Sequence, residues 1–370
     1  MVPFTEVGSQ TWDSWLVGLQ TATYLHSSLF LEYLHHCVPE AGRRSFALLD
    51  EKGEPLALCP LGISSVRIGL RDLKEGSWGG YPIAYPAMRV ENATLRRRLA
   101  RSVFEVVHRL TDEAGLARVT FRLHPLSLRC MRGDLRPINT MEAMCQGYAC
   151  HPQNTVIIDL SISVGDLEAR MTQYHRKRIR KSERQGISVR AFQGLAPGTK
   201  EALAGYQQAH FISSGRRTRP QKTFDLMSDY AHEGRAALFV AYVRETPISY
   251  LYCGQFDRMA FGWSQANLAE FEREYSPRHI LEWEAVKWYK SQGYLYYDVG
   301  LRLYGPQPYK VPTDKEISIS DLKERSGGDL WPDLCFERFF EKQAYEEMMR
   351  ERQAQFLSSS YFPTSPNLGD

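Results

Sequence analysis

The sequence has no CxxC pair, and its seven cysteines are scattered along the chain. Disulfide frameworks and zinc sites both need cysteines at recurring spacings. Cys145, Cys150 and His151 lie close together, but no second ligand pair follows them. We therefore expect no metal site and reduced thiols in a reducing compartment, the cytoplasm.

Several other signals are missing from the chain. No apolar run approaches the ~18–20 residues that span a bilayer, and the N-terminal segment lacks the basic and apolar parts of a signal peptide. GxSxG, P-loop and HExxH motifs are also missing, which disfavours hydrolases, kinases and metalloproteases. The net charge is only +3, so a polyanionic partner would have to bind a local basic patch.

The chain is long enough for two hydrophobic cores. It has 370 residues, of which 43% are hydrophobic, and single cores rarely grow past roughly 250–300 residues. Glycine and proline interrupt the pattern between Arg129 and Gln153, so we place a domain boundary near residue 152. The expected parts are an N-terminal domain at 1–152, a C-terminal domain at 153–357 and a flexible tail at 358–370.

Hydrophobic periodicity predicts an α/β (α+β) protein. In the first half we expect helices at 11–20, 28–37 and 94–114, and strands at 45–50, 55–68 and 117–123. In the second half we expect strands at 155–160, 187–192, 236–244, 246–255, 258–265 and 294–298. Its helices are expected from the capping box at Ser163 to Gly186, at 199–212, at 223–232, after Pro277 to Gly293, and from Pro332. This order is that of the acetyltransferase (GNAT) fold, and the first half is a vaguer version of it.

The segment Tyr174–Arg184 (YHRKRIRKSER) is strongly basic. Such a density of charge repels itself unless a polyanion such as a phosphate backbone neutralises it. The alternative is a solvated basic face, which is common on surface helices. The candidate contacts to phosphate or nucleic acid are Arg176, Lys177, Arg180, Lys181 and Arg184, and Arg178 adds a sixth cation.

The segment Glu272–Ile280 (EREYSPRHI) contains no glycine. Enzymes of the acetyltransferase fold that use acyl-CoA bind its pyrophosphate on a glycine-containing turn at this place, where helix N-terminal N–H groups face the phosphates. Pro277 suits a first helical turn but removes one donor. Coenzyme A is therefore disfavoured, while Arg278 remains a candidate phosphate contact.

Four segments together resemble the Fem family of tRNA-dependent aminoacyltransferases and its acetyltransferase-like relatives. They are TVIIDLSIS…RKRIRKSERQGISV, ALFVAYVRETPISYLY, SPRHILEWEAVKWYKSQGYLYYDVG and DKEISISDLKERSGGDLWP, in order over residues 155–340. The resemblance implies twin GNAT-like domains, each a mixed, mostly antiparallel sheet flanked by helices. It also implies transfer of an amino acid from aminoacyl-tRNA to an amine, with the acceptor on the N-terminal side.

The resemblance also suggests catalytic residues. Lys323 occupies the family's lysine position, and an ammonium there would stabilise the oxyanion and the leaving ribose oxygen; the alternative is an exposed lysine on a charged loop. Leu322 and Ser326 replace aromatic residues of the family pattern, so the packing of this loop is expected to differ. Asp298 is either a general base or a structural carboxylate that holds the following turn, and we favour the second.

The acceptor is expected near the loop SWGGYPIAYP, with Trp78, Gly80 and Tyr81 as candidate contacts, although the loop also reads as a plain hydrophobic turn. Arg217, in the basic loop 216–219, is a further candidate. The two-helix insertion of larger Fem enzymes is missing, so their acceptor and tRNA docking cannot be carried over.

The leading hypothesis is a tRNA-dependent aminoacyltransferase that needs no cofactor or metal and acts on a peptidoglycan precursor or a peptide-like metabolite. Its partners would be aminoacyl-tRNA and an amine acceptor. An acyl-CoA-dependent N-acyltransferase is the second hypothesis, and a non-enzymatic RNA-binding protein is the third.

Overall fold

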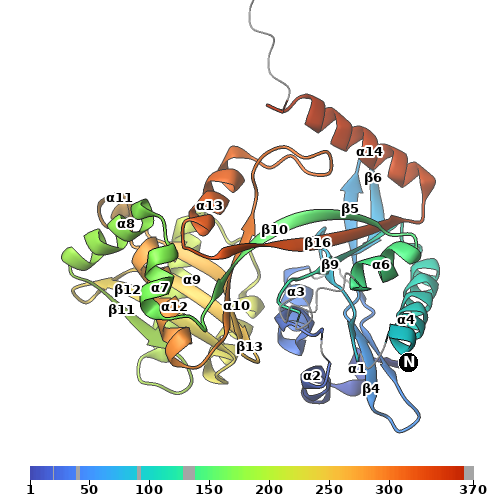
Figure 1. Cartoon of the computed structure of the whole chain (residues 1–370), viewed down its shortest axis with the longest axis horizontal. Coiled ribbons are helices and arrows are strands. Elements are labelled where there is room, and N and C mark those ends of the chain that lie inside the picture. The colour runs from blue at the N-terminus through green and yellow to red at the C-terminus, as the bar shows by residue number, and fades with distance from the viewer. Residues whose placement is uncertain (20, 39–41, 90–92, 128–137, 362–370) are drawn as a thin grey trace, which may run out of the picture. The chain divides into compact units, whose positions relative to one another are not determined.

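The computed structural model describes residues 1–19, 21–38, 42–89, 93–127 and 138–361 (Figure 1). The chain folds into two compact units. Unit 1 comprises residues 1–154, 302–321 and 332–370, and unit 2 comprises residues 155–301 and 322–331. Helices and mostly antiparallel sheets alternate in the chain, so the predicted α/β class is confirmed. The expected tail lies outside the described residues beyond Tyr361.

A mostly antiparallel sheet forms the centre of unit 2. Its strands follow the order β11 (Ile187–Phe192), β12 (Ala236–Val243), β13 (Thr246–Phe256), β14 (Met259–Asn267), β15 (Tyr296–Arg302), and then residues 155–159 of β10 (Ala149–Asp159). The first four strands pair antiparallel, and β15 joins β14 in parallel. Each of the strands predicted for this half is present; β11 has the predicted bounds, and the others have shifted ends.

Six helices belong to unit 2. They are α7 (Val164–Arg170), α8 (Gln173–Arg184), α9 (Thr199–Ser214), α10 (Gln221–His232), α11 (Ala269–Tyr275) and α12 (Arg278–Ser291). The single helix predicted from Ser163 to Gly186 is wrong, because the chain breaks into two separately capped helices. The Ser163 hydroxyl accepts from the Asp166 N–H, and the Thr172 hydroxyl accepts from the His175 N–H.

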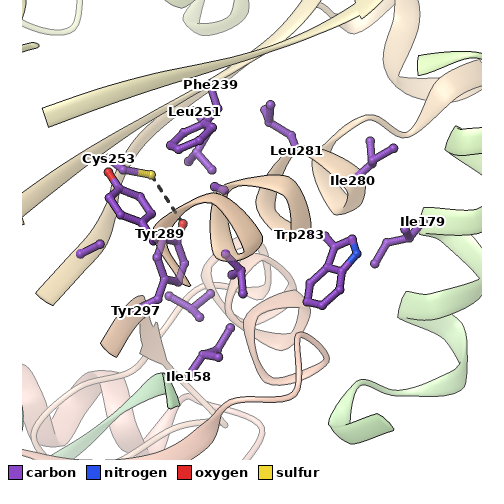
Figure 2. Packing of buried hydrophobic residues seen from close by; sticks show 14 of the residues in the cluster. Ile158, Ile179, Phe239, Leu251, Cys253, Ile280, Leu281, Trp283, Tyr289 and Tyr297 are labelled. Atoms are coloured by element: carbon purple, nitrogen blue, oxygen red, sulfur yellow. Dashed lines mark hydrogen bonds between the residues drawn. The ribbon is translucent and has the colours of Figure 1, made fainter. Parts of the chain in front are cut away.

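The core of unit 2 lies between α12 and the sheet (Figure 2). Leu281 and Ala285, four residues apart and so on one side of this helix, are fully buried, and Tyr289 joins them one turn later. Full burial of a leucine side chain contributes roughly 1.5–3 kcal/mol. The hydroxyl of Tyr297 meets the Cys253 sulfur at 3.6 Å in the same core (Figure 2).

Unit 1 contains two groups of strands. One sheet has the order β1 (Val2–Pro3), β3 (Phe46–Leu49), β4 (Pro55–Cys59) and β8 (Ala87–Met88). The other strands are β2 (Gly42–Arg43), β5 (Gly62–Ile68), β6 (Arg71–Gly76), β7 (Ile83–Ala84), β9 (Arg118–Leu123), residues 149–154 of β10, and β16 (Asp329–Phe339) from residue 332 onward. The single strand predicted at 55–68 is thus two strands, separated by Pro60 and Leu61.

The remaining helices belong to unit 1, except that α13 passes into unit 2 after Asp321. They are α1 (Phe4–Val7), α2 (Ser9–Val17), the short 3-10 helix η1 (Tyr24–His26), α3 (Ser28–Cys37), α4 (Ala93–Ala114), α6 (Ile138–Cys145), α13 (Asp314–Glu324) and α14 (Lys342–Leu357). The carboxylate of Glu316 accepts from the Thr313 N–H and hydroxyl, while the Thr313 hydroxyl accepts from the Glu316 N–H. This reciprocal capping box starts α13.

The helix predicted from Pro332 is wrong, because residues 329–339 form strand β16. Its Leu334–Phe339 segment pairs antiparallel with β9. Two ion pairs reinforce this pairing: Arg122 with Asp333 at 2.5 Å, and Arg118 with Glu337 at 3.5 Å. The tertiary pairing therefore outweighs the local pattern that indicated a helix, and the helix α14 begins only at Lys342.

Candidate functional site

Strands β14 and β15 pair over only three residues. The pairs are Met259 with Tyr296, Ala260 with Tyr297, and Phe261 with Asp298. Tyr252 faces Ser264 but Cys253 faces Gly262 in the β13–β14 register, which makes Trp263 the extra residue of a bulge. Because a bulge bends the strand that carries it, β14 turns away from β15 beyond this point. Backbone groups of both strands become available where the two strands part.

Asp298 lies at the last of these pairs and is 3% exposed. Its Oδ1 accepts a hydrogen bond from the Thr155 hydroxyl at 2.8 Å and one from the Gly300 N–H at 2.9 Å. The carboxylate therefore holds the backbone that follows it. These contacts favour a structural carboxylate over a general base.

Lys323 reaches the end of the same strand. Its Nζ donates to the Leu301 carbonyl oxygen at 3.2 Å. A Cβ at position 300 would lie 2.8 Å from this Nζ, and Gly300 has a φ of 108°. Glycine therefore meets two requirements here, because it adopts the positive φ and leaves room for the ammonium.

Glu282, on α12, lies within electrostatic range of this lysine. Burial raises the pKa of its carboxyl group, and the positive charges of Arg278 and Lys323 partly oppose that shift. An acidic residue in the N-terminal half of α12 also matches the helix dipole. Glu282 follows Arg278 by four residues, or one helical turn, and this spacing in the sequence predicts that the two side chains interact.

Three guanidinium groups lie near the N-terminus of α12. Arg178 and Arg325 pack on the ring of Tyr174 at 5.1 and 5.0 Å from its centroid. Both of them, together with Arg278, help to lower the pKa of His279. We call Arg178, Arg278 and Arg325 the arginine group. Cations beside the N–H groups of a helix N-terminus favour the binding of an anion such as phosphate.

The arginine group borders a buried histidine pair. The Nδ1 atoms of His175 and His279 are 3.2 Å apart. Burial lowers the pKa of His175 to about 4 and that of His279 to about 3, and the neighbouring arginines and histidine add to the shift. The pair is therefore neutral at pH 7, with one ring donating to the other.

The glycine-free segment before α12 contains helix α11, which the sequence did not indicate. Its C-terminal carbonyl groups are held by α8: the Lys181 Nζ and the Gln185 side-chain amide donate to Glu274, and the Ser182 hydroxyl donates to Tyr275. Cations at a helix C-terminus are favourable. Lys181 and Ser182 of the basic helix α8 thus stabilise the packing of α11.

Arg176 has a similar role at α7. Its Nη1 donates to the carbonyl oxygens of Glu168, Ala169 and Met171, which end that helix. Arg176 and Lys181 were both predicted to contact tRNA phosphate. In the structure each satisfies backbone carbonyl groups of the chain itself.

The other predicted phosphate contacts on α8 point outward. Lys177, Arg180 and Arg184 are exposed on one face of the helix and, with Glu183, line a surface hollow. Arg180 also pairs with Glu168 at 3.0 Å, but this pair is exposed and contributes little to stability. We call Lys177, Arg180 and Arg184 the outer basic face.

The predicted acceptor contacts differ in exposure. Trp78 is 2% exposed, and its ring packs so closely on Gly62 that a Cβ there would lie 2.5 Å away. Gly80 has a φ of 88°, and Tyr81 is 74% exposed. Arg217 is in unit 2, where it donates to Gln221 and packs over Phe211. Trp78 is therefore a core residue of unit 1, and Tyr81 offers the accessible ring of this loop.

Sequence reasoning missed a cavity in unit 1. It has a volume of about 250 Å³ and is lined by residues of the segments 152–154 and 302–312. Arg302, Tyr304, Tyr309 and Lys310 contribute its charged and aromatic groups. Both segments read as irregular and proline-containing in the sequence, so only the fold brings them together.

Two further properties concern the described part of the chain. None of its helices is both long and apolar enough to cross a membrane. No group of three or more His, Cys, Asp or Glu side chains among the described residues could hold a metal ion.

Comparison with known proteins agrees with the strand arrangement of unit 2. The family model for the acetyltransferase (GNAT) domain matches residues 169–311. This segment is thus similar to a GNAT domain. The match covers the basic helix, the strands β12 to β15 and α12, so the parting of β14 and β15 lies within the matched segment. No curated protein matches the chain by sequence.

Solved structures share the fold over the length of the chain. The crystal structure of FemX has 13% identity and a TM-score of 0.67, and the match covers 92% of this chain and 98% of FemX. L-PGS from Bacillus licheniformis has 15% identity and a TM-score of 0.59, with 94% and 96% covered. A tandem GNAT protein from the clavulanic acid biosynthesis pathway has 11% identity and a TM-score of 0.51, with 91% and 97% covered.

The predicted resemblance in fold to Fem-like proteins is therefore confirmed, as is the twin-GNAT architecture. The match to the GNAT family model supports an acyltransferase enzyme.

Proposed function

We propose that this protein transfers an aminoacyl group from aminoacyl-tRNA to an amine and so forms an amide bond. The observation that carries the proposal is the position of Lys323, whose ammonium lies against Gly300 and Leu301 where β14 and β15 part. The acceptor would be a peptidoglycan precursor or a peptide-like metabolite. Reaction with aminoacyl-tRNA would place the enzyme in the cytoplasm.

The proposed reaction needs little beyond positioning and charge stabilisation. The amine nitrogen attacks the ester carbonyl carbon and forms the new C–N bond. The C–O bond to the ribose breaks, and the proton lost by nitrogen passes to the departing oxygen. The ammonium of Lys323 would stabilise the negative charge on the carbonyl oxygen and on the leaving oxygen. The ester is already activated, so orientation of the two substrates supplies much of the remaining rate.

Two groups of cations suit the tRNA. The arginine group and the N-terminus of α12 would bind a phosphate near the aminoacylated end. The outer basic face would contact phosphates further along the RNA. Arg176 and Lys181 are not among the proposed tRNA contacts, because they donate to backbone carbonyl groups at the ends of α7 and α11.

Acyl-CoA is the alternative donor. The arginine group at the α12 N-terminus favours it, because a pyrophosphate would bind there as readily as an RNA phosphate. Against it stands α11, which fills the segment before α12 without a glycine.

A donor comparison tests the proposal. The purified protein is given a panel of amines together with either tRNA charged with labelled amino acids or labelled acetyl-CoA. We expect amide-linked label only with aminoacyl-tRNA, and no complex with acetyl-CoA by calorimetry. A micromolar acetyl-CoA complex together with acetyl transfer would overturn the proposal in favour of the alternative.

A further inference from the structure

Positively charged and aromatic side chains line the cavity in unit 1. Arg302 and Lys310 are its cations, and no aspartate or glutamate lines it among the residues that the structure describes. The rings of Tyr304 and Tyr309 also line it. Its volume of about 250 Å³ is below the range of typical drug-sized ligand sites. A ligand of this cavity is therefore small.

Internal contacts fix the walls of this cavity. The Tyr309 hydroxyl donates to the Pro152 carbonyl oxygen at 2.5 Å, which ties the two lining segments together. The ring of Tyr309 also stacks on His151 with centroids 4.6 Å apart. A site whose side chains are held in this way loses little conformational entropy when a ligand binds.

Arg302 is held most firmly. It is 8% exposed, and its guanidinium donates to the Leu303 carbonyl and to the side chains of Ser320 and Asp321. The guanidinium also lies 4.2 Å from the centre of the Tyr304 ring. Its charge therefore stays at a fixed place in the cavity wall.

Lys310 is the more exposed of the two cations. Its Nζ lies 3.3 Å from a Glu316 carboxylate oxygen, and both side chains are about 40% exposed. An exposed pair of this kind contributes little to stability. A lysine ammonium has three N–H donors, so Lys310 can bind a ligand while it keeps its contact with Glu316.

We propose that this cavity binds the anionic end of a small amine acceptor, a molecule of the size of an amino acid or dipeptide that carries a carboxylate or a phosphate. The inference rests on the proposed function and adds the chemical class of its acceptor. Arg302 directly follows Leu301, whose carbonyl oxygen accepts from Lys323. The same stretch of β15 thus carries a wall of the cavity and a contact of the proposed catalytic ammonium.

The test is a binding measurement without any tRNA. The full-length protein is titrated with glycylglycine, with glycylglycine amide and with O-phosphoethanolamine, and binding is followed by ligand-observed NMR and calorimetry. We expect at least one of the two anionic ligands to bind about tenfold or more tighter than the amide, because hydrogen bonds to charged groups are the stronger ones. Preference for glycylglycine identifies a carboxylate acceptor, and preference for O-phosphoethanolamine identifies a phosphate acceptor. Equal affinity for all three, or no binding of any, overturns the proposal.

Two variants locate the site. Lys310→Gln should reduce the preference for the anion to about threefold or less, whereas Lys315→Gln, on the exposed side of α13, should leave it unchanged. Gly305 lines the cavity, and a Cβ there meets no heavy atom within 4 Å. Gly305→Trp should therefore fold, fill the cavity and abolish binding of all three ligands. A folded Gly305→Trp protein that binds like the wild type would place the ligand elsewhere.

The binding result and the proposed donor can fail independently. If anions bind in the cavity but no aminoacyl-tRNA supports transfer to any amine, the acceptor site stands and the donor proposal falls. If transfer proceeds but neither Lys310→Gln nor Gly305→Trp changes the KM for an anionic acceptor, the donor proposal stands and the cavity is not the acceptor site.

Discussion

The Nζ atom of Lys323 lies 3.2 Å from the carbonyl oxygen of Leu301, in the space that a Cβ at Gly300 would need. The ammonium is thus fixed by backbone atoms of a central strand, although the lysine comes from helix α13, more than twenty residues later. Preorganised charge of this kind stabilises a transition state without reorganisation during the reaction.

We predict that Lys323→Met lowers kcat on the order of 10²–10³-fold with little change in the KM of either substrate, because the lost interaction forms in the transition state. Methionine keeps much of the length and apolar bulk of the stem, so the Tm should change little. Single-turnover transfer and a melting curve measure the two effects. Lys315→Met is the matched control on the same helix. A folded Lys323→Met protein with a near-normal rate contradicts the catalytic role.

The second prediction concerns the outer basic face. Replacing Lys177, Arg180 and Arg184 together with alanine should weaken tRNA binding similarly for all tRNA sequences. The slope of log K against log salt should flatten by about 0.7–0.9 for each lost phosphate contact. Fluorescence anisotropy at several salt concentrations measures both.

A matched control tests whether this effect is local. Replacing Arg97, Arg98 and Arg101 on α4 removes the same charge from exposed positions of another helix. It should leave the salt slope nearly unchanged. Equal effects of the two triple variants would mean that net charge, rather than the outer basic face, attracts the RNA.

The third prediction concerns Asp298. Asp298→Asn keeps an oxygen that can accept from Thr155 and Gly300, so a structural carboxylate should tolerate it with a modest fall in Tm and a near-normal kcat. Asp298→Ala leaves those two buried donors unpaired, which typically costs about 1–3 kcal/mol for each group. Urea denaturation and transfer kinetics separate the outcomes. A stable Asn variant that has lost its activity would identify a general base instead.

The fourth prediction is a pH dependence of stability. His175 and His279 have folded pKa values of about 4 and about 3, both below the unfolded value of about 6.5. The unfolded chain therefore binds more protons, and stability is lost as the pH falls from about 6.5 towards 4. Each histidine contributes a slope of up to about 1.4 kcal/mol per pH unit.

Replacing both histidines with glutamine removes this titration while it keeps a donor and an acceptor in the pair. Urea denaturation at pH 7, 6 and 5 should show a smaller loss of stability for the double variant than for the wild type. His26 and His210 also have pKa values lowered to about 4, so part of the dependence will remain. Identical slopes in the two proteins would show that the pair is not buried in its neutral form.

The elements of the second half could be read from the sequence because each has a strong local pattern. The apolar residues of α12 repeat with the helical period, and β12 to β14 are rich in β-branched and aromatic residues. The break at Met171 and Thr172 was missed, because Leu167 and Tyr174 continue the helical pattern across it. The cap at Thr172 is itself a sequence signal that the pattern obscured.

The parts of the candidate site that were missed depend on contacts between distant segments. The strand β16 exists because it pairs with β9, some two hundred residues earlier. The cavity joins the segments 152–154 and 302–312. The outer basic face could have been found: Ile179 and Ser182 are buried on one side of α8, which places Lys177, Arg180 and Arg184 on the other by helical spacing.

The division of the chain between the two units has a consequence for any attempt to separate them. The backbone passes from one unit to the other at 154–155, 301–302, 321–322 and 331–332. A fragment ending at residue 154 would lose the Leu334–Phe339 partner of β9 and expose that strand as an aggregation-prone edge. A fragment starting at residue 155 and ending at 301 would lose Lys323. Neither half can be cut out as a single continuous piece, so each unit depends on the other part of the chain for its completion.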